Sequence, residues 1–132
     1  MKKQLCVATL CIVIAVAAFG QSAERTETVH FLRGTSSTTI KGTIKGYAGV
    51  NYLLGAKADQ AVSISFKPSN GSCYFNVWAP GADSAMYMGE TSGNEFKGKL
   101  PADGSYKIQV YLMRNAARRQ ESCRYTLSIG IE

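Results

Sequence analysis

The sequence predicts an all-β protein of about eight short strands, and three observations lead to this prediction. Apolar and polar residues alternate with period two through most of the chain after residue 20. Turn residues interrupt this alternation every 8 to 15 residues. No long window shows a helical period. Such strands bury one face each, so we expect two antiparallel sheets packed face to face, or a barrel. A length of 132 residues allows one domain.

Each expected strand is bounded by turn residues. In the run from residue 61, Val62, Ile64 and Phe66 alternate with serines, which is typical of a half-buried strand. The Pro-Ser-Asn-Gly segment at residues 68–71 is a turn. One helix of at most two turns is allowed, at residues 115–121. The expected strands cover residues 28–32, 37–45, 51–58, 61–67, 73–79, 95–100, 105–113 and 123–131.

The first 20 residues have the pattern of a cleavable signal peptide. Lys2 and Lys3 precede an apolar run at residues 5–19, and small residues follow at the spacing that signal peptidase reads. The run of 15 residues is shorter than the roughly 20 that a membrane-spanning helix needs, so we expect no stable membrane anchor. We predict a signal peptide at 1–20 and one domain at 21–132. Removing the two lysines lowers the net charge from +6 to +4.

Export changes the interpretation of the cysteines. Cys73 and Cys123 are the two thiols left after residue 20. In an oxidising compartment an even pair of cysteines indicates a disulfide, although two separate buried thiols are the alternative. Closing a loop of about 50 residues contributes on the order of 4 kcal/mol in the chain-entropy model.

The residue types argue against an enzyme. His30 is the one histidine, no nucleophile-elbow sequence presents a serine, and no glycine-rich phosphate loop is present. No Cys–His cluster indicates a metal, so we expect no catalytic residues, no metal and no cofactor. A carboxylate pair that meets only in the fold is the remaining enzyme hypothesis.

Four arginines lie close together near the C-terminus: Arg114, Arg118, Arg119 and Arg124. Because no aromatic residues are interleaved with them and the protein is exported, we expect no nucleic-acid partner. Arg118 and Arg124 are interpreted as solvated. Arg114 and Arg119 are interpreted as gripping carboxylates on a partner or ordering their own loop.

The segment Leu-Pro-Ala-Asp-Gly-Ser-Tyr at residues 100–106 predicts a stiff hairpin corner. A stiff exposed loop loses little entropy on binding. Periodicity alone places Tyr106 in the core, on the same face as Ile108.

With these residues in view, the chain resembles the bacterial periplasmic inhibitors of invertebrate-type and goose-type lysozymes. The Arg-Asn-Ala-Ala-Arg-Arg segment at 114–119 is the more specific part of the resemblance. The turn at 100–106 also looks like jelly-roll domains at the ends of secreted peptidases, which is a likeness of fold alone. The other matching segments lie at residues 29–34, 36–37, 44–47, 56–58 and 111–113.

The resemblance implies a jelly-roll-like antiparallel β-sandwich in the periplasm that places a Ser-Gly-x-Tyr loop in the lysozyme cleft. Here the loop corresponds to Asp103, Gly104, Ser105 and Tyr106, so an aspartate replaces the first serine. A third carboxylate near the catalytic acids would be repelled or would share a proton. Ser105 could supply the hydroxyl, Asp103 could brace its own turn, or inhibition could be weak or directed elsewhere; we favour hydroxyl donation by Ser105 and Tyr106, with Asp103 shaping the loop.

The resulting hypothesis is a lysozyme inhibitor that helps its cell evade host defence. The loop at 103–106 would fill the cleft, with Tyr111, Arg114 and Arg119 included among the partner contacts. A charge of +4 does not steer the chain toward basic lysozymes, so the invertebrate type is favoured over the goose type. A homodimer is compatible with the sequence.

The alternative function is a secreted carbohydrate-binding or adhesion module without inhibitory activity. It would stack sugars on Tyr74, Trp78 and Tyr111.

Overall fold

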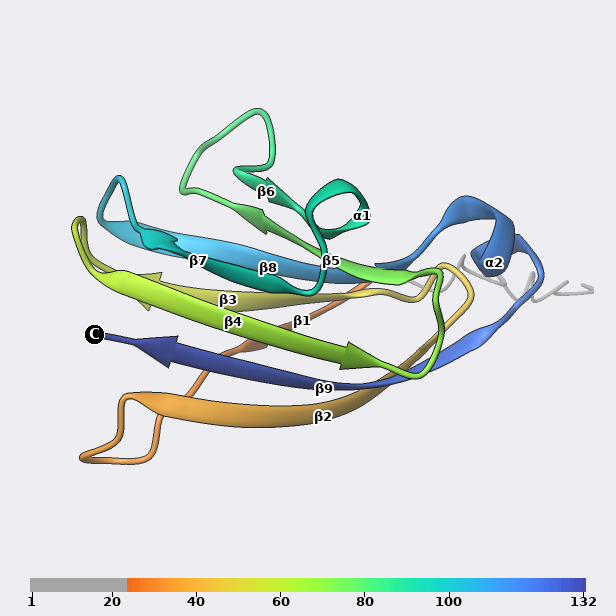
Figure 1. The fold of residues 1–132 in the computed structure, drawn as a ribbon, viewed down its shortest axis with the longest axis horizontal. Helices are drawn as coiled ribbons and strands as arrows, with labels where there is room; N and C mark the ends of the chain where they lie inside the picture. Colours follow the sequence, from red (N-terminus) through yellow and green to blue (C-terminus); the bar gives the residue numbers. More distant parts are fainter. Residues whose placement is uncertain (1–23) are drawn as a thin grey trace, which may run out of the picture.

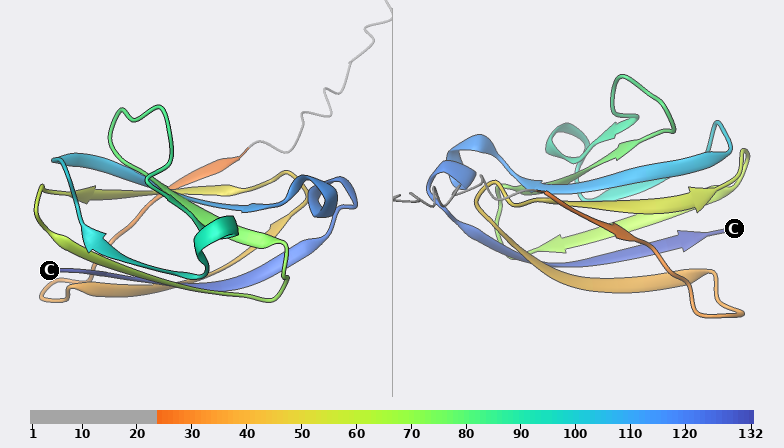
Figure 2. Two further views of the ribbon diagram at one scale, coloured as in Figure 1. Left: turned by 45° about the horizontal axis from the view of Figure 1, so that its top comes forward. Right: turned by 180° about the vertical axis from the view of Figure 1, so that it is seen from behind.

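The structure is a computed structural model that describes residues 24–132, so the predicted signal peptide lies outside the described residues. Nine strands and two short helices form two layers (Figures 1 and 2). The elements are β1 (Arg25–Thr28), β2 (Ser37–Lys45), β3 (Val50–Ala56), β4 (Ala61–Pro68), β5 (Cys73–Trp78), β6 (Tyr87–Met88), α1 (Gly89–Ser92), β7 (Glu95–Lys99), β8 (Gly104–Leu112), α2 (Arg114–Arg118) and β9 (Ser122–Ile131).

The two layers are a five-stranded and a four-stranded sheet. The first has the order β1-β3-β8-β5-β6 and the second β2-β9-β4-β7. Their pairings are antiparallel, with one exception: β1 pairs with β3 in parallel. The prediction of an antiparallel β-sandwich with one disulfide is therefore confirmed, with this parallel edge strand as a difference.

Period-two alternation places the core between the sheets. On β4, Val62, Ile64 and Phe66 are all buried, as their spacing predicts. On β8 the residues that share a face with Tyr106 are buried in the same way. The outward positions of these strands carry polar side chains, which is the expected pattern for a sandwich with two solvated outer faces.

The structure corrects two parts of the sequence interpretation. The first strand covers Arg25–Thr28 rather than 28–32. After it, the Val29 amide donates to Leu53 O at 2.8 Å and the chain then crosses to the other sheet, which leaves Leu32 exposed. The short β6 and α1 were not predicted, because two-residue and four-residue elements carry too few positions to show a period.

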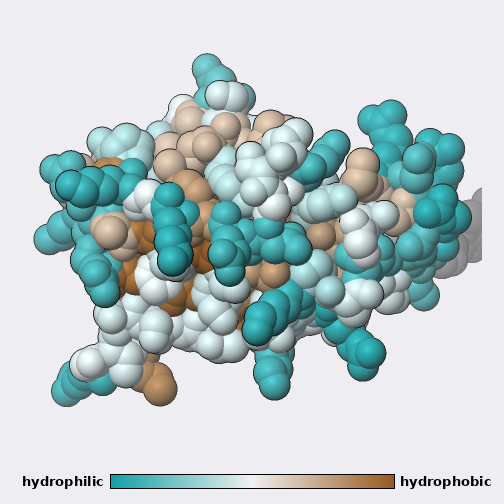
Figure 3. Space-filling model, in the orientation of Figure 1, coloured by the Kyte–Doolittle hydropathy of each residue, from teal (hydrophilic) through white to brown (hydrophobic). Residues whose placement is uncertain are grey.

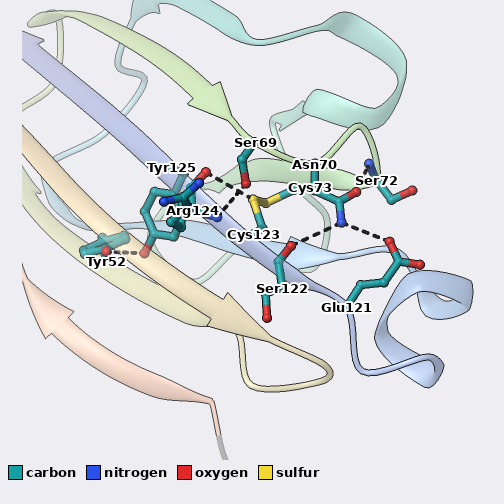
Figure 4. Close-up of a disulfide and its surroundings, with 10 residues drawn as sticks. All are labelled: Tyr52, Ser69, Asn70, Ser72, Cys73, Glu121, Ser122, Cys123, Arg124 and Tyr125. Atoms are coloured by element: carbon teal, nitrogen blue, oxygen red, sulfur yellow. Dashed lines mark hydrogen bonds between the residues drawn. A yellow bond between two sulfur atoms is a disulfide. The ribbon is translucent and has the colours of Figure 1, made fainter.

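The predicted disulfide joins the two sheets. Cys73 begins β5 and Cys123 lies near the start of β9, and their Cα atoms are 6.4 Å apart (Figure 4). Both cysteines are buried. Because the bridge links one sheet to the other, it holds the layers together at a single end of the sandwich.

The turns between strands gather at the two ends of the sandwich, and helix α2 lies at one of these ends (Figure 1). We name these regions by their contents. The α2 end comprises the turns at 46–49 and 69–72 and the segment 113–121. The loop end comprises the turns at 57–60 and 100–103. β8 runs from one end to the other, and its nine residues span about 27 Å.

Candidate partner-binding site

Helix α2 is a short cap on the sandwich that is held by its two alanines. Ala116 and Ala117 are buried, while Arg114 and Arg118 are exposed. The helix therefore turns its small residues inward and its cations outward. The Met113 amide donates to Ser72 O at 2.8 Å, which ties the start of the helix to the β4–β5 turn.

The turn between β2 and β3 presents Tyr47, whose side chain is 52% exposed. Gly46 has a φ of +59°, and a Cβ atom there would lie 2.6 Å from the Gln120 side chain. Glycine adopts this left-handed backbone conformation without steric cost. The Gly46 amide also donates to Glu121 O at 3.0 Å, so the Tyr47 turn packs against the segment that follows α2.

Arg119 orders its own segment rather than extending freely. Its guanidinium lies 2.7 Å from Glu121 Oε2, and the other carboxylate oxygen, Glu121 Oε1, accepts a hydrogen bond from Asn70 Nδ2 at 3.0 Å. These two contacts, first the Asn70 amide and then Arg119, lower the pKa of Glu121. Asn70 also donates to Ser122 O, as Figure 4 shows. Of the two roles predicted for Arg119, the structure displays loop ordering.

Tyr111 lies in a shallow hollow beside Tyr47. The hollow has a volume of about 340 Å³ and is lined by Glu24, Gly46, Tyr47, Gly49, Asn76, Gln109, Tyr111 and Leu112. The Tyr111 hydroxyl donates to Glu90 Oε2 at 3.4 Å. Burial is the main cause that raises the pKa of Tyr111, followed by the charge of Glu90. The hollow and the exposed tyrosine together form one accessible surface at the α2 end.

At the loop end, Asp103 is a brace between two turns. Its Oδ1 accepts a hydrogen bond from the Ala58 amide at 2.7 Å. The Asp59 amide donates to Leu100 O at 2.8 Å, and the Leu100 amide donates to Gln60 O at the same distance. Asp103 therefore shapes its loop as predicted, but by holding the neighbouring β3–β4 turn rather than by bracing its own turn.

The structure corrects the direct role predicted for Tyr106. Its side chain is only 1% exposed. The hydroxyl donates to Ala102 O at 2.7 Å and accepts from the Ala102 amide at 3.1 Å. Tyr106 therefore cannot reach a partner in this conformation, and periodicity alone predicts its position correctly. Gly104 and Ser105 remain exposed.

The predicted contact residues fall into two separate groups. Asp103, Gly104 and Ser105 lie at the loop end, while Tyr111, Arg114 and Arg119 lie at or beside the α2 end. The length of β8 keeps the groups apart, so Arg114 and Arg119 do not flank the loop as the hypothesis required. Tyr47 was not among the predicted contacts, although an aromatic residue between two turn glycines could have indicated it.

The aromatic residues of the alternative function lie on the outer face of the five-stranded sheet. Tyr74 and Tyr111 pair across strands with ring centroids 6.4 Å apart. Lys107 Nζ lies 4.9 Å from the Trp78 ring centroid and partly covers it. A continuous three-ring platform is therefore interrupted by a lysine.

Within residues 24–132, no three His, Cys, Asp or Glu side chains are placed to hold a metal ion. Over the same range no helix has the length and apolar character needed to cross a membrane. His30 is exposed beyond the end of β1. A β-sandwich with cross-braced turns, and with an exposed tyrosine and exposed arginines at one end, is typical of a protein-binding module.

Comparison with known proteins identifies the family of this protein-binding module. No family model matches the sequence. The chain is 31% identical over 114 residues to an inhibitor of g-type lysozyme from Escherichia coli strain K12, covering 84% of each chain. The chain belongs to the family of periplasmic inhibitors of g-type lysozyme, and it is a periplasmic protein. Its relatives are enzyme inhibitors and not enzymes, in agreement with the sequence prediction.

Solved structures agree with this assignment. A periplasmic inhibitor of g-type lysozyme from Aeromonas hydrophila superimposes with a TM-score of 0.75 at 37% identity, covering 83% of this chain and 98% of that one. The inhibitor from Salmonella Typhimurium gives 0.67 at 29% identity, with 83% and 100% coverage. A pre-peptidase C-terminal domain of a Bacillus anthracis collagenase shares the fold, with a TM-score of 0.57 at 17% identity over 86% and 100% of the chains.

Proposed function

We propose that this chain inhibits g-type lysozyme by covering the active-site cleft of the enzyme. The support for this target is the family: the relatives named above are inhibitors of g-type lysozyme. None of these relatives is named for the invertebrate type, so the preference for that class has no support beyond the charge argument.

The α2 end is the contact surface that we favour. The observation that carries this choice is the exposure of Tyr47 at the tip of a turn braced by Gly46 and Glu121. Tyrosine and arginine are the residue types that dominate binding energy at protein interfaces. Because the turns are already hydrogen-bonded, little ordering entropy is lost on binding.

Charge favours the same end. Lysozymes use carboxylic acid side chains in an open cleft, and a guanidinium is a planar donor that suits a carboxylate. Arg114 and Arg118 are exposed, and neither forms an ion pair within residues 24–132. The hydrophilic surface around α2 is visible at the right of Figure 3.

The loop at 103–106 remains the second location for the contact. Its exposed part is reduced to Asp103, Gly104 and Ser105, and one oxygen of Asp103 is already engaged by Ala58. Ser105 is then the hydroxyl donor available to a catalytic acid.

Inhibition assays with matched variants test the proposal. Clearing of a cell-wall suspension by a g-type lysozyme is measured with the wild-type protein, Tyr47→Ala, Arg114→Ala and Ser105→Ala. We expect Tyr47→Ala to weaken inhibition by about tenfold or more and Ser105→Ala to change it by less than about twofold. Parallel assays with an invertebrate-type and a chicken-type enzyme should show weaker inhibition.

Three results would contradict parts of the proposal. Loss of inhibition in Ser105→Ala with none in Tyr47→Ala would move the contact to the loop end. Stronger inhibition of the invertebrate-type enzyme would restore that target. A wild-type protein that binds glycan but never slows clearing would favour the carbohydrate-binding alternative.

The homodimer that the sequence allows stays a prediction. Light scattering of the purified protein tests it.

A further inference from the structure

The outer face of the four-stranded sheet is unusual in its side chains. We call it the hydroxyl face. Its outward positions on β9, the strand between β2 and β4, are Arg124, Thr126, Ser128 and Gly130. The flanking outward positions are Ser37, Thr39, Lys41, Thr43 and Lys45 on β2, Ala61, Ser63, Ser65 and Lys67 on β4, and Glu95, Lys97 and Lys99 on β7.

Small side chains leave this face hollowed along β9. Three adjoining hollows of about 510, 210 and 710 Å³ follow the strand from Arg124 to Glu132. The last two share Ser37, Ser63 and Gly130, so they are continuous. The three hollows together form a shallow trough about 27 Å long, the length of nine strand residues. Part of this face is visible as the pale surface at the bottom of Figure 3, from which hydrophilic side chains project.

Cations line the trough. They are Lys41, Lys67, Lys97, Lys99 and Arg124, with Lys45 beyond them at the end of β2, and all are exposed. Glu95 and Glu132 are the acids of the same face. None of these eight side chains forms an ion pair with another residue of the described range 24–132. The trough therefore has an uncompensated positive charge.

Register brings cations and hydroxyls into rows across the strands. Lys41 and Lys67 both pair with Thr126, so a threonine hydroxyl lies between two lysines. One step along, Thr43 pairs with Arg124. Hydroxyls both donate and accept hydrogen bonds, while the cations supply donors for anions.

The side chains that line the trough indicate which class of ligand it would bind. No aromatic side chain points outward at these positions, and Tyr125 is buried beneath Gly42. Sugar stacking is therefore absent from this face, in contrast to the platform of Tyr74 and Tyr111. Hydroxyls with spaced cations suit an extended polymer that carries both sugar hydroxyls and carboxylates.

We propose that the hydroxyl face binds the carboxylate-bearing glycan of the cell wall, peptidoglycan, without any lysozyme present. Charge complementarity supports this occupant, because the peptides of peptidoglycan end in carboxylates and its sugars carry hydroxyl and amide groups. The periplasmic location places the protein beside this polymer. Binding there would hold the inhibitor at the surface on which lysozyme acts. It uses a sheet face rather than the α2 end.

Co-sedimentation with purified cell-wall sacculi tests the inference. The face variant combines Lys41→Glu, Lys67→Glu and Arg124→Glu. A control variant combines Arg33→Glu, Lys57→Glu and Lys107→Glu, which change the net charge equally at positions outside the trough. Circular dichroism establishes that both variants fold.

We expect the face variant to bind sacculi about tenfold more weakly than wild type and the control to change by less than about threefold. Wild-type binding should weaken as salt is raised. Equal binding by the face variant and wild type, or equal weakening in both variants, overturns the inference.

A second arm needs no variant. Sacculi whose carboxylates have been converted to amides should lose the wild-type protein; if they retain it as well as untreated sacculi do, carboxylate recognition is wrong. Inhibition of a g-type lysozyme on a soluble substrate is measured alongside. The face variant should keep that inhibition, so failure of wall binding and failure of the proposed function give different results.

Discussion

At the scale of single residues, Tyr106 and Asp103 hold the loop end by different hydrogen bonds. The Tyr106 hydroxyl bonds both backbone groups of Ala102 from inside the core. Asp103 reaches across to the Ala58 amide. Neither contact leaves the tip free to adapt, so the β7–β8 turn is a rigid part of the sandwich.

Tyr106→Phe separates the structural role of this hydroxyl from any role in binding. We expect a loss of about 1 kcal/mol in the free energy of unfolding, because the Ala102 amide and carbonyl lose a partner. Inhibition of lysozyme should be unchanged, because the side chain is buried. Denaturant unfolding and an inhibition assay measure the two effects. If Tyr106→Phe kept wild-type stability but lost inhibition, the Tyr106 hydroxyl would have a role in binding rather than in structure.

Glu121 predicts a pH dependence at the opposite end. Its pKa is lowered in the folded protein by Asn70 and Arg119. The stabilisation is therefore complete above the ordinary pKa of a glutamate and is lost as the pH falls through the lowered pKa of the folded state. In Glu121→Gln this part of the acid dependence should disappear. Thermal unfolding from pH 3 to 7 measures it, and identical slopes for variant and wild type would contradict the assignment.

At the scale of elements, the α2 end is a set of turns fastened to each other. The β2–β3 turn donates a hydrogen bond to Glu121 O, and the β4–β5 turn accepts one from the Met113 amide. The Asn70 side chain donates a hydrogen bond to Ser122 O at the start of β9. The disulfide joins β5 to β9 beside these contacts (Figure 4). The turn that carries Tyr47 and the helix that carries the arginines are thus held in one arrangement.

Removing the bridge with Cys73→Ser and Cys123→Ser should cost about 2–5 kcal/mol of stability. It should also speed amide exchange across residues 113–121, because that segment loses its anchor at Cys123. Calorimetry and hydrogen exchange measure the two effects. Unchanged exchange in this segment would show that the hydrogen bonds alone fasten the α2 end.

The sequence was sufficient to predict most strands and some residues of the proposed site, Tyr111 and Arg114, but not how the α2 end is assembled. Alternation at period two identifies β4, β8 and β9 because each buries one whole face. The α2 end could not be predicted in this way, because Gly46, Asn70 and Glu121 meet only when three turns far apart in the chain converge. The position of Tyr106 shows the reverse case: simple periodicity was correct and the role inferred from the family motif was not.

At the scale of the whole molecule, the sandwich separates three surfaces. The loop end and the α2 end lie at the two ends of β8, and the hydroxyl face lies along β9. We assign lysozyme to the α2 end and the cell-wall glycan to the hydroxyl face. The hydroxyl face meets the α2 end at Ser69 and from there extends away from it along β9. We therefore expect a single copy of the chain to hold both partners at once.

The most direct test of the central claim is amide hydrogen exchange of this protein with and without a g-type lysozyme. Our account predicts that the enzyme slows exchange at residues 46–49 and 113–121 and leaves residues 100–105 unchanged. Protection confined to residues 100–105, with none around Tyr47 and α2, would contradict it.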